Sequence, residues 1–280
     1  MKIVRSIREI KSELIRCRNK GRAVGFVPTM GYLHEGHLSL IRKARQDNDV
    51  VVVSIFVNPT QFGPDEDYGE YPRDLRRDAR LCKKSGADYM FHPTVKSMYP
   101  KEYSTFISVE GLTKNLCGKF RPGYFRGVAT VVAKLFNIVK PDVAYFGQKD
   151  AQQSIVIKRM TEDLDMGIRV EVMPTVREKD GLAMSSRNSY LSSDERKRAV
   201  TIYRALQLAR DLIKLDDKDA RGIIREMRKM LAPVATKIDY VSIVDPHTLK
   251  DVKTITGEVL VAVAVWIGAT RLIDNILTRY

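Results

Sequence analysis

The stretch Val24-Gly-Phe-Val-Pro-Thr-Met-Gly-Tyr-Leu-His-Glu-Gly-His37 decides the fold of this chain. The apolar residues 23–27, which overlap the start of this stretch, predict a short strand that Pro28 to Gly31 interrupt. The residues that follow predict a helix beginning near His37, because apolar side chains recur there at helical spacing. These side chains are Leu38, Ile41 and Ala44. A strand that passes into a helix through a glycine-containing turn is typical of a parallel α/β sheet.

The segments on either side continue the alternation of strands and helices. Residues 50–57 are an unbroken apolar run rich in β-branched side chains, which predicts a central parallel strand covered on both faces. Apolar stripes at helical spacing predict helices at residues 3–17 and around residues 128–139. Further strands are expected at residues 88–92, 143–147 and 168–173. This order predicts the α/β class with a doubly wound parallel sheet.

The pattern changes after about residue 175. Ser192 and Glu195 have the spacing of a helix capping box, and two amphipathic helices are expected after Ser192. Three strand-like segments follow, at residues 238–244, 259–267 and 271–276. The chain is therefore expected to hold a first domain at residues 1–175 and a smaller α+β domain at residues 176–280.

The composition argues against several classes of protein. Lys and Arg number 48 against 34 Asp and Glu, a formal charge of +14, but charges of both signs are mixed along the chain. This favours a solvated surface that receives anionic substrates over a nucleic-acid-binding patch, which remains the second class of function. No apolar signal segment is found, and the most apolar stretch, residues 259–268, is too short to span a bilayer. Cys17, Cys82 and Cys117 are widely spaced, which indicates reduced thiols in a cytoplasmic protein.

The turn His34-Glu35-Gly36-His37 has the features of a phosphate site. Ligands of doubly wound sheets bind at the carboxyl ends of strands, where a helix N-terminus offers unpaired amides and the positive end of its dipole. Gly31 and Gly36 permit close approach of backbone and ligand. His34 and His37 are three residues apart, so their rings share one face if the helix has begun by His34, and there they can donate hydrogen bonds to phosphate oxygens.

Two other interpretations of this turn are weaker. A zinc site of the metalloprotease type needs its second histidine four residues after the first, whereas residue 38 is Leu and no cysteine lies nearby. Two unrelated surface histidines are the other alternative. The chain has only four histidines, however, and two of them fall in this one glycine-flanked turn.

Three further polar segments carry candidate ligand-binding side chains. After the strand at 143–147, Lys149 suits a phosphate and Asp150 suits ribose hydroxyls. Arg187, in a loop with two serines, suits a polyphosphate because its guanidinium binds phosphate in a bidentate manner. Asn58 and Gln61 are neutral polar groups just past the strand at 50–57. Taken singly, each segment is also explained as an ordinary turn with side-chain caps.

Together these segments resemble the pantoate–β-alanine ligase family. The resemblance is carried by VPTMGYLHEGHLSLIRKA from residue 27, SIFVNPTQF from residue 54, RPGYFRGVATVVAKLFNIVKPDVAYFGQKDAQQ from residue 121 and REKDGLAMSSRNSYLS from residue 177. It covers most of residues 24–191, and the C-terminal LIDN also fits. It implies a Rossmann-like domain, a smaller C-terminal domain that closes over the ATP site, and a homodimer.

The resemblance also implies roles for individual residues. His37 matches the general acid, with His34 and Lys149 beside it in catalysis. Gln61 and Gln153 match the residues that hold pantoate, and Gln61 is also near β-alanine. From its place just past the strand at 50–57, Asn58 is expected to bind substrate with them. The implied ATP contacts are Met30, Gly31, Tyr32, Leu33, His34, Glu35, Gly36, His37, Gly147, Gln148, Lys149, Asp150, Val176, Met184, Ser185, Ser186 and Arg187. Tyr124 and Lys179 depart from the family pattern, at positions without an assigned contact.

The implied reaction condenses (R)-pantoate with β-alanine at the expense of ATP, giving pantothenate, AMP and pyrophosphate in the route to coenzyme A. Pantoyl adenylate is the implied intermediate. The family uses Mg²⁺, for which the sequence indicates no protein ligand. Another HxGH nucleotidyltransferase with a different acceptor is the alternative, and the GQKDAQQ and VNPTQF segments argue against it. The expected partners are ATP, pantoate, β-alanine and a second copy of the chain, with no nucleic acid and no membrane.

Overall fold

The computed structural model describes residues 1–64 and 66–280. The chain divides into two compact units. The first unit comprises residues 1–109, 121–147 and 156–174. The second unit comprises residues 110–120, 148–155 and 175–280. The main division falls between Pro174 and Thr175, and two short segments from the N-terminal half cluster with the second unit.

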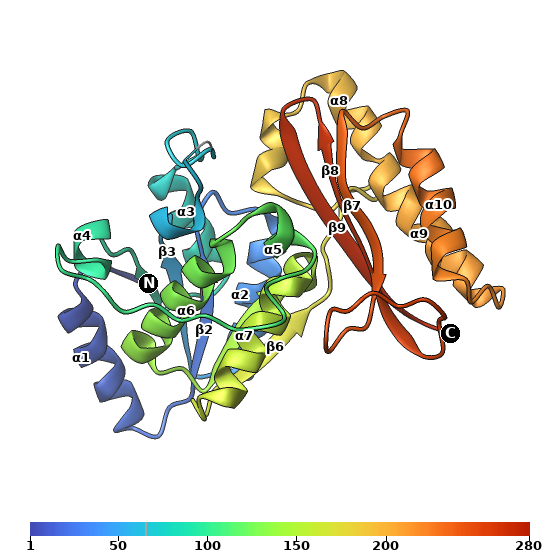
Figure 1. Cartoon of the computed structure of the whole chain (residues 1–280). Coiled ribbons are helices and arrows are strands. Elements are labelled where there is room, and N and C mark those ends of the chain that lie inside the picture. Colours follow the sequence, from blue (N-terminus) through green and yellow to red (C-terminus); the bar gives the residue numbers. More distant parts are fainter. Residues whose placement is uncertain (65) are drawn as a thin grey trace. The chain divides into compact units, whose positions relative to one another are not determined.

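The first unit is built on a six-stranded sheet whose strands are all parallel (Figure 1). The strands are β1 (Lys2–Val4), β2 (Val24–Thr29), β3 (Val50–Ile55), β4 (Tyr89–Phe91), β5 (Val143–Gly147) and β6 (Arg169–Met173), in the spatial order β1-β4-β3-β2-β5-β6. All six residues of β3 are buried. The predicted α/β class with a Rossmann-like parallel sheet is confirmed.

Helices cover both faces of this sheet. They are α1 (Ile7–Arg18), α2 (Glu35–Asp47), α3 (Leu75–Lys84), α4 (Val95–Met98), α6 (Tyr124–Val139) and α7 (Ala151–Asp163). Side chains of α2 and α3 share one hydrophobic core with Val51, Val53 and Ile55 of β3. Helices α1 and α6 contact each other, and the Arg18 guanidinium donates to the Val139 carbonyl at 3.0 Å. In Figure 1, α6 lies in front of the sheet and α2 behind it.

The strand order creates a switch point at β2. Strand β3 lies on one side of β2 and β5 on the other, so the chain leaves β2 in one direction and later returns to its opposite edge. Ligands of open α/β sheets bind where the carboxyl ends of such strands diverge. Met30 directly follows β2, Phe56 follows β3 and Gln148 follows β5.

The second unit contains an antiparallel sheet of β7 (Lys237–Val244), β8 (Glu258–Ile267) and β9 (Thr270–Arg279), in that order. Its helices are α5 (Cys117–Phe120), α8 (Ser193–Ala199), α9 (Thr201–Lys214) and α10 (Ala220–Leu231). Ile202 of α9 and Ile223 of α10 share a core with Val261 and Val263 of β8. The predicted smaller α+β fold is therefore observed.

One buried side chain explains why residues 110–120 and 148–155 belong together. The Gln152 amide oxygen accepts from the Cys117 backbone N–H at 2.9 Å. Its nitrogen donates to the carbonyls of Leu112 and Asn115, both at 2.8 Å. The Asn115 amide in turn donates to the Leu249 carbonyl at 2.8 Å. These bonds tie both segments to the C-terminal part of the chain.

Two local predictions differ from the structure. The apolar stripe predicts one helix over residues 3–17, but Lys2–Val4 pair with β4 as strand β1, and Ser6 then caps a helix that begins at Ile7. The first of the two helices expected after Ser192 is divided in the structure, because α8 ends at Ala199 and α9 begins at Thr201. The capping box of Ser192 and Glu195 is present as predicted.

The described residues also show the state of the cysteines and the character of the helices. All three cysteines are buried and unpaired. Within residues 1–64 and 66–280, none of the helices combines the length and the apolar character that crossing a membrane requires.

Candidate active site

The turn between β2 and α2 begins with hydrogen bonds to neighbouring backbone. The Thr29 hydroxyl donates to the Ser54 carbonyl at 2.8 Å and accepts from the Gly31 N–H at 3.1 Å. Gly31 has a φ of 87°, and Tyr32 has a φ of 49°. A side chain at residue 31 would strain this left-handed backbone and would lie 3.0 Å from the Asp78 carboxylate. The turn is therefore bent tightly against α3.

The carboxylate of Asp78 holds this turn from outside. It accepts from the backbone N–H groups of Tyr32 and Leu33, both at 2.8 Å, and is only 1% exposed. Burial raises the pKa of the Asp78 carboxyl, although the two amides and the Arg77 charge act in the opposite direction. The Arg77 guanidinium also lies 5.2 Å from the centre of the Tyr32 ring. Asp78 thus supplies partners to two amides that the turn itself leaves unpaired.

Two histidines form a reciprocal cap at the start of α2. Nδ1 of His34 accepts from the Gly36 N–H at 3.2 Å, and Nδ1 of His37 accepts from the His34 N–H at 3.3 Å. The ring centres are 4.0 Å apart, and their planes are inclined by 40°. A Cβ at residue 36 would lie 2.9 Å from the His34 ring, so glycine there makes room for this cap. The predicted shared face of the two rings is therefore observed.

This cap fixes where each imidazole carries its proton. A ring nitrogen that accepts from a backbone N–H has its lone pair directed at that hydrogen. Each neutral ring therefore carries its hydrogen on Nε2. The two Nε2–H groups are then hydrogen-bond donors at the amino end of a helix, where the dipole also favours an anion. The arrangement suits phosphate oxygens without requiring an imidazolium.

The other implied residues of this turn have different surroundings. Leu33 is fully buried in the core of the first unit. The Glu35 carboxylate forms an ion pair with Arg42. Among the described residues there is no group of three or more His, Cys, Asp or Glu that could hold a metal ion. Both Asp78 oxygens are also engaged by backbone amides, so the carboxylate of Asp78 is not available as a magnesium ligand.

Asn58 and Gln61 lie after β3, on a short helical turn over Pro59–Gln61. The Asn58 amide nitrogen donates to Gln61 Oε1 at 2.9 Å and to the Gly127 carbonyl at 3.2 Å. Its oxygen accepts from the Tyr99 hydroxyl at 2.8 Å and from Thr60. Asn58, 1% exposed, is therefore saturated within the protein. Gln61 Nε2 makes no hydrogen bond with another described residue, so Asn58 orients an amide whose donor end remains available.

Close packing of α6 supports this pair. The Cβ of any side chain at residue 127 would lie 2.1 Å from the Thr60 carbonyl oxygen. Glycine at this position lets α6 approach the turn closely enough for Asn58 to reach the Gly127 carbonyl. Arg121, before α6, donates to the Gln61 carbonyl at 3.0 Å and stacks on Tyr124 at 3.8 Å from the ring centre. The tyrosine that departs from the family pattern therefore has a packing role.

The second unit holds most of the remaining candidate residues, whereas Gly147 ends β5 in the first unit. Gln148–Asp150 form a short helical turn before α7. The side chains of Lys149, Asp150 and Gln153 make no hydrogen bond or ion pair with other described residues. The Met184 N–H donates to the Val176 carbonyl at 3.0 Å, which brings these two residues together. The Ser185 hydroxyl caps the next turn by accepting from the Arg187 N–H at 3.3 Å.

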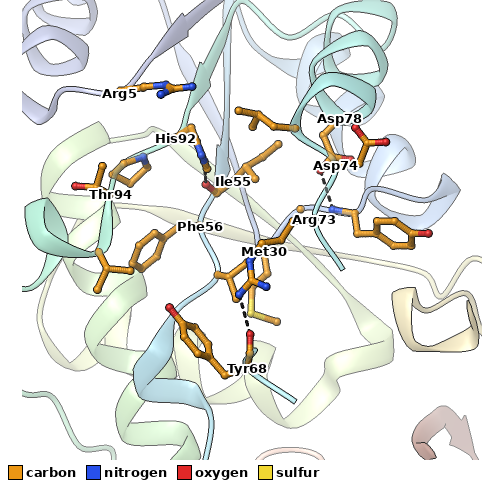
Figure 2. A pocket seen from close by; sticks show the side chains of 16 residues that line it. Arg5, Met30, Ile55, Phe56, Tyr68, Arg73, Asp74, Asp78, His92 and Thr94 are labelled. Carbon is orange, nitrogen blue, oxygen red and sulfur yellow. Dashed lines mark hydrogen bonds between the residues drawn. The ribbon is translucent and has the colours of Figure 1, made fainter. Parts of the chain in front are cut away.

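A cavity of about 300 Å³ lies beside the histidine turn in the first unit (Figure 2). Arg5, Met30, Phe56 and His92 follow β1, β2, β3 and β4 and line it. His92 Nδ1 lies 2.8 Å from the Ile55 carbonyl, so it carries the hydrogen and Nε2 is an acceptor. The other lining residues, mostly apolar, are Gly31, Tyr32, Ile55, Val57, Tyr68, Arg73, Asp74, Leu75, Asp78, Pro93, Thr94 and Val95. A small ligand with an aliphatic body suits these walls.

The sequence alone did not identify Asp78 or His92 as functional residues. Asp78 lies among arginines on a charged helix, and its partners are about 45 positions earlier in the chain. No local pattern marks such a long-range contact. The context of His92, directly after a short strand, was the only available signal, since that place lies at the ligand-binding edge of the sheet.

Comparison with known proteins identifies relatives over the whole chain. The family model described as pantoate-beta-alanine ligase matches residues 2–277. The chain is 56% identical to the pantothenate synthetase of Moorella thermoacetica over 278 residues, covering 99% of this chain and 98% of the relative. It is 57% identical to the pantothenate synthetase of Thermotoga petrophila over 276 residues, covering 98% and 99%.

Solved structures agree with the sequence relatives. The pantothenate synthetase of Thermus thermophilus superposes with a TM-score of 0.94 at 47% identity, covering 99% of both chains. The pantoate-beta-alanine ligase of Francisella tularensis, solved in complex with beta-gamma ATP and beta-alanine, gives a TM-score of 0.81 at 37% identity and covers 99% of this chain and 97% of its own.

The Asp78 contact predicts a pH-dependent effect of substitution. Because the folded-state pKa is raised, stability from this carboxyl is present below its ordinary pKa of about 3.9 and is lost as the pH rises through the folded value. We expect Asp78→Asn to lower the free energy of unfolding by about 1–3 kcal/mol at pH 4, since one amide loses its acceptor, and by less at pH 7. Urea unfolding of both proteins across this range measures the difference. A destabilisation that grows with pH would show that the amides outweigh burial.

Proposed function

Because the chain belongs to the pantoate–β-alanine ligase family, we propose that it condenses (R)-pantoate with β-alanine, using ATP and releasing AMP and pyrophosphate. The chain is thus a member of a ligase family that makes pantothenate. The observation that carries the proposal is the reciprocal histidine cap, which directs two Nε2–H donors from the N-terminus of α2. The Francisella relative was solved with an ATP derivative and β-alanine, which supports the same ligands here.

In the proposed first step, a carboxylate oxygen of pantoate attacks the α-phosphorus of ATP. The bond between this phosphorus and the bridging oxygen breaks, and pyrophosphate leaves with its electron pair. Negative charge grows on phosphate oxygens, so fixed donors stabilise the transition state more than the ground state. We assign this role to His34 and His37 through Nε2, together with Lys149 and Arg187. Because each Nδ1 serves the cap, the histidines act here as hydrogen-bond donors.

In the proposed second step, the neutral amine of β-alanine attacks the acyl carbon of pantoyl adenylate. An amide bond forms, the acyl–oxygen bond breaks, and AMP leaves as the phosphate anion. The amine loses one proton in this step. Gln61 and Gln153 are assigned to pantoate, because neutral amides bind its hydroxyls without repelling its carboxylate. Asn58 is assigned the orientation of Gln61, since its own amide is saturated.

The ATP contacts are proposed to comprise the backbone of Met30 to His37 and the segments around Gly147–Asp150, Val176 and Met184–Arg187. We propose that magnesium is bound by the phosphates of ATP. A homodimer and a cytoplasmic location are proposed from the family resemblance. The cavity beside Met30 is lined by neither Gln61 nor Gln153, so it does not bear on the placement of pantoate.

Product analysis with each substrate omitted in turn tests the proposed reaction. ATP and pantoate alone should support exchange of labelled pyrophosphate into ATP, because adenylate formation needs no amine. Release of AMP and pantothenate should require β-alanine as well. Formation of ADP and phosphate would contradict adenylation, and exchange that requires β-alanine would contradict the two separate steps.

Substitution of His37 separates its cap from its donor. Asparagine places an acceptor near the position of Nδ1, and glutamine places a donor near that of Nε2. We expect His37→Asn to lower turnover on the order of a hundredfold, as for loss of a transition-state donor, with little change in Tm. His37→Gln should recover part of the rate.

Steady-state kinetics and melting curves measure both variants, with the exposed His247→Ala as a control. A wild-type rate in His37→Asn would remove His37 from the proposed chemistry.

Substitution of Gln61 tests the placement of pantoate. Gln61→Met keeps the length of the side chain but removes its donor, and loss of such a hydrogen bond is worth about tenfold in affinity. We expect the KM for pantoate to rise about tenfold and the KM for ATP to change less than threefold. Initial rates with each substrate varied separately provide the comparison. Equal increases for both substrates would speak against this placement.

A further inference from the structure

Strand β9 of the second unit carries two buried polar residues, Asp274 and Asn275, that no step above uses. Asn275 is 4% exposed, and its side chain is fully engaged. Its amide nitrogen donates to the carbonyls of Gln148 and Lys149, both at 2.9 Å. Its amide oxygen accepts from Gln148 Nε2, also at 2.9 Å. One side chain therefore fixes the backbone of the turn before α7.

Asp274 makes an equally specific contact. Its carboxylate, 3% exposed, accepts from both terminal nitrogens of Arg177, at 2.6 and 3.0 Å. Arg177 also donates to the Gly181 carbonyl at 3.1 Å and lies 4.1 Å from the centre of the Tyr203 ring. Arg177 bridges to Ala183 in a small antiparallel pair. The ion pair thus anchors the loop between Val176 and Met184 to β9.

Adjacent residues of a strand point to opposite faces of its sheet. Leu272 and Ile276 belong to the core shared with α9 and α10, so Asp274 lies on that face and Asn275 on the other. A single dipeptide of β9 therefore holds two segments that are far apart in sequence. Both segments contain residues assigned above to ATP.

The charges at this place leave Lys149 available. Burial raises the pKa of the Asp274 carboxyl, while the hydrogen bonds and charge of Arg177 and the charge of Lys149 act in the opposite direction. Lys149 is therefore within electrostatic reach of Asp274. Arg177 already satisfies both carboxylate oxygens, and the Lys149 ammonium makes no ion pair with another described residue. Its backbone is held by Asn275 while its charge stays free for a ligand.

We propose that Asn275 is a positioning residue for ATP, which fixes the Gln148–Lys149 backbone so that the Lys149 ammonium meets phosphate. The proposal rests on the proposed function, because it takes ATP as the ligand of Lys149. Asn275 acts through the turn and does not touch the nucleotide. Because Arg177 binds both oxygens of the Asp274 carboxylate, this carboxylate does not form an ion pair with Lys149.

The variants Asn275→Asp and Asn275→Ala test this role. Asn275→Asp keeps the acceptor for Gln148 Nε2 but sets carboxylate oxygen against two carbonyl oxygens. We expect both variants to raise the KM for ATP at least tenfold and the KM for pantoate less than threefold. Hydrogen exchange of the backbone at residues 147–151 should become faster. The control Leu272→Ala weakens the same strand and should lower Tm without raising the KM for ATP.

The outcomes separate the positioning role from general damage and from failure of the proposed function. A KM for ATP within twofold of wild type in Asn275→Asp would overturn the proposal, as would an equal increase in Leu272→Ala. Calorimetry with a non-hydrolysable ATP analogue tests Asn275 without pantoate. Suppose that wild type binds the analogue but releases no pyrophosphate from ATP in the presence of pantoate. The proposed reaction would then be wrong, but the effect of Asn275→Asp on the affinity for the analogue would still decide the positioning role.

Discussion

The contact between the Asp78 carboxylate and the amides of Tyr32 and Leu33 is the constraint on which the first unit's site depends. A turn that runs through two left-handed residues leaves these amides without partners of its own. Without that acceptor, the buried N–H of Leu33 and the partly buried N–H of Tyr32 would be unpaired, and an unpaired buried amide costs about 1–3 kcal/mol. The direction in which α2 leaves the sheet is therefore set by α3, a helix that follows the next strand. Site geometry here is a tertiary property rather than a property of the histidine motif.

A related arrangement is found beside two residues that we propose to meet a ligand, Gln61 and Lys149. A buried side chain with all its hydrogen bonds satisfied fixes a neighbour whose outer group remains available. Asn58 does this for Gln61, and Asn275 does it for the backbone of Lys149. Groups whose hydrogen bonds are all made within the protein hold their neighbours in place before a ligand arrives. Such preorganisation is what electrostatic catalysis requires, because little has to reorient during the reaction.

The sequence predicted correctly those helices and strands whose formation depends on interactions between residues close together in the chain. The strand at Val143–Gly147 and the capping box at Ser192 are as expected, because apolar run length and side-chain capping act over a few residues. Strand β1 was missed because Lys2–Val4 pair with β4, far away in sequence. Helix α3 was missed because charged residues cover most of it, and only Asp78 and Cys82 are buried.

For the candidate site, the sequence likewise identified residue types but not the contacts between distant residues. His34 and His37 are recognisable from their spacing beside glycine, but the reciprocal cap and the resulting tautomers appear only in the folded backbone. Asn58 was predicted as a substrate ligand because a neutral amide suits that role, whereas its hydrogen bonds within the protein depend on Gly127 and Tyr99.

The position of Asp274 and Asn275 near the end of the chain has a consequence for synthesis on the ribosome. Chains grow at about 5–20 residues per second, so Lys149 leaves the ribosome on the order of ten seconds before Asn275. During that interval the nascent chain has Lys149 but not the strand that holds its backbone, so we expect the proposed ATP site to be complete only when β9 has joined its sheet.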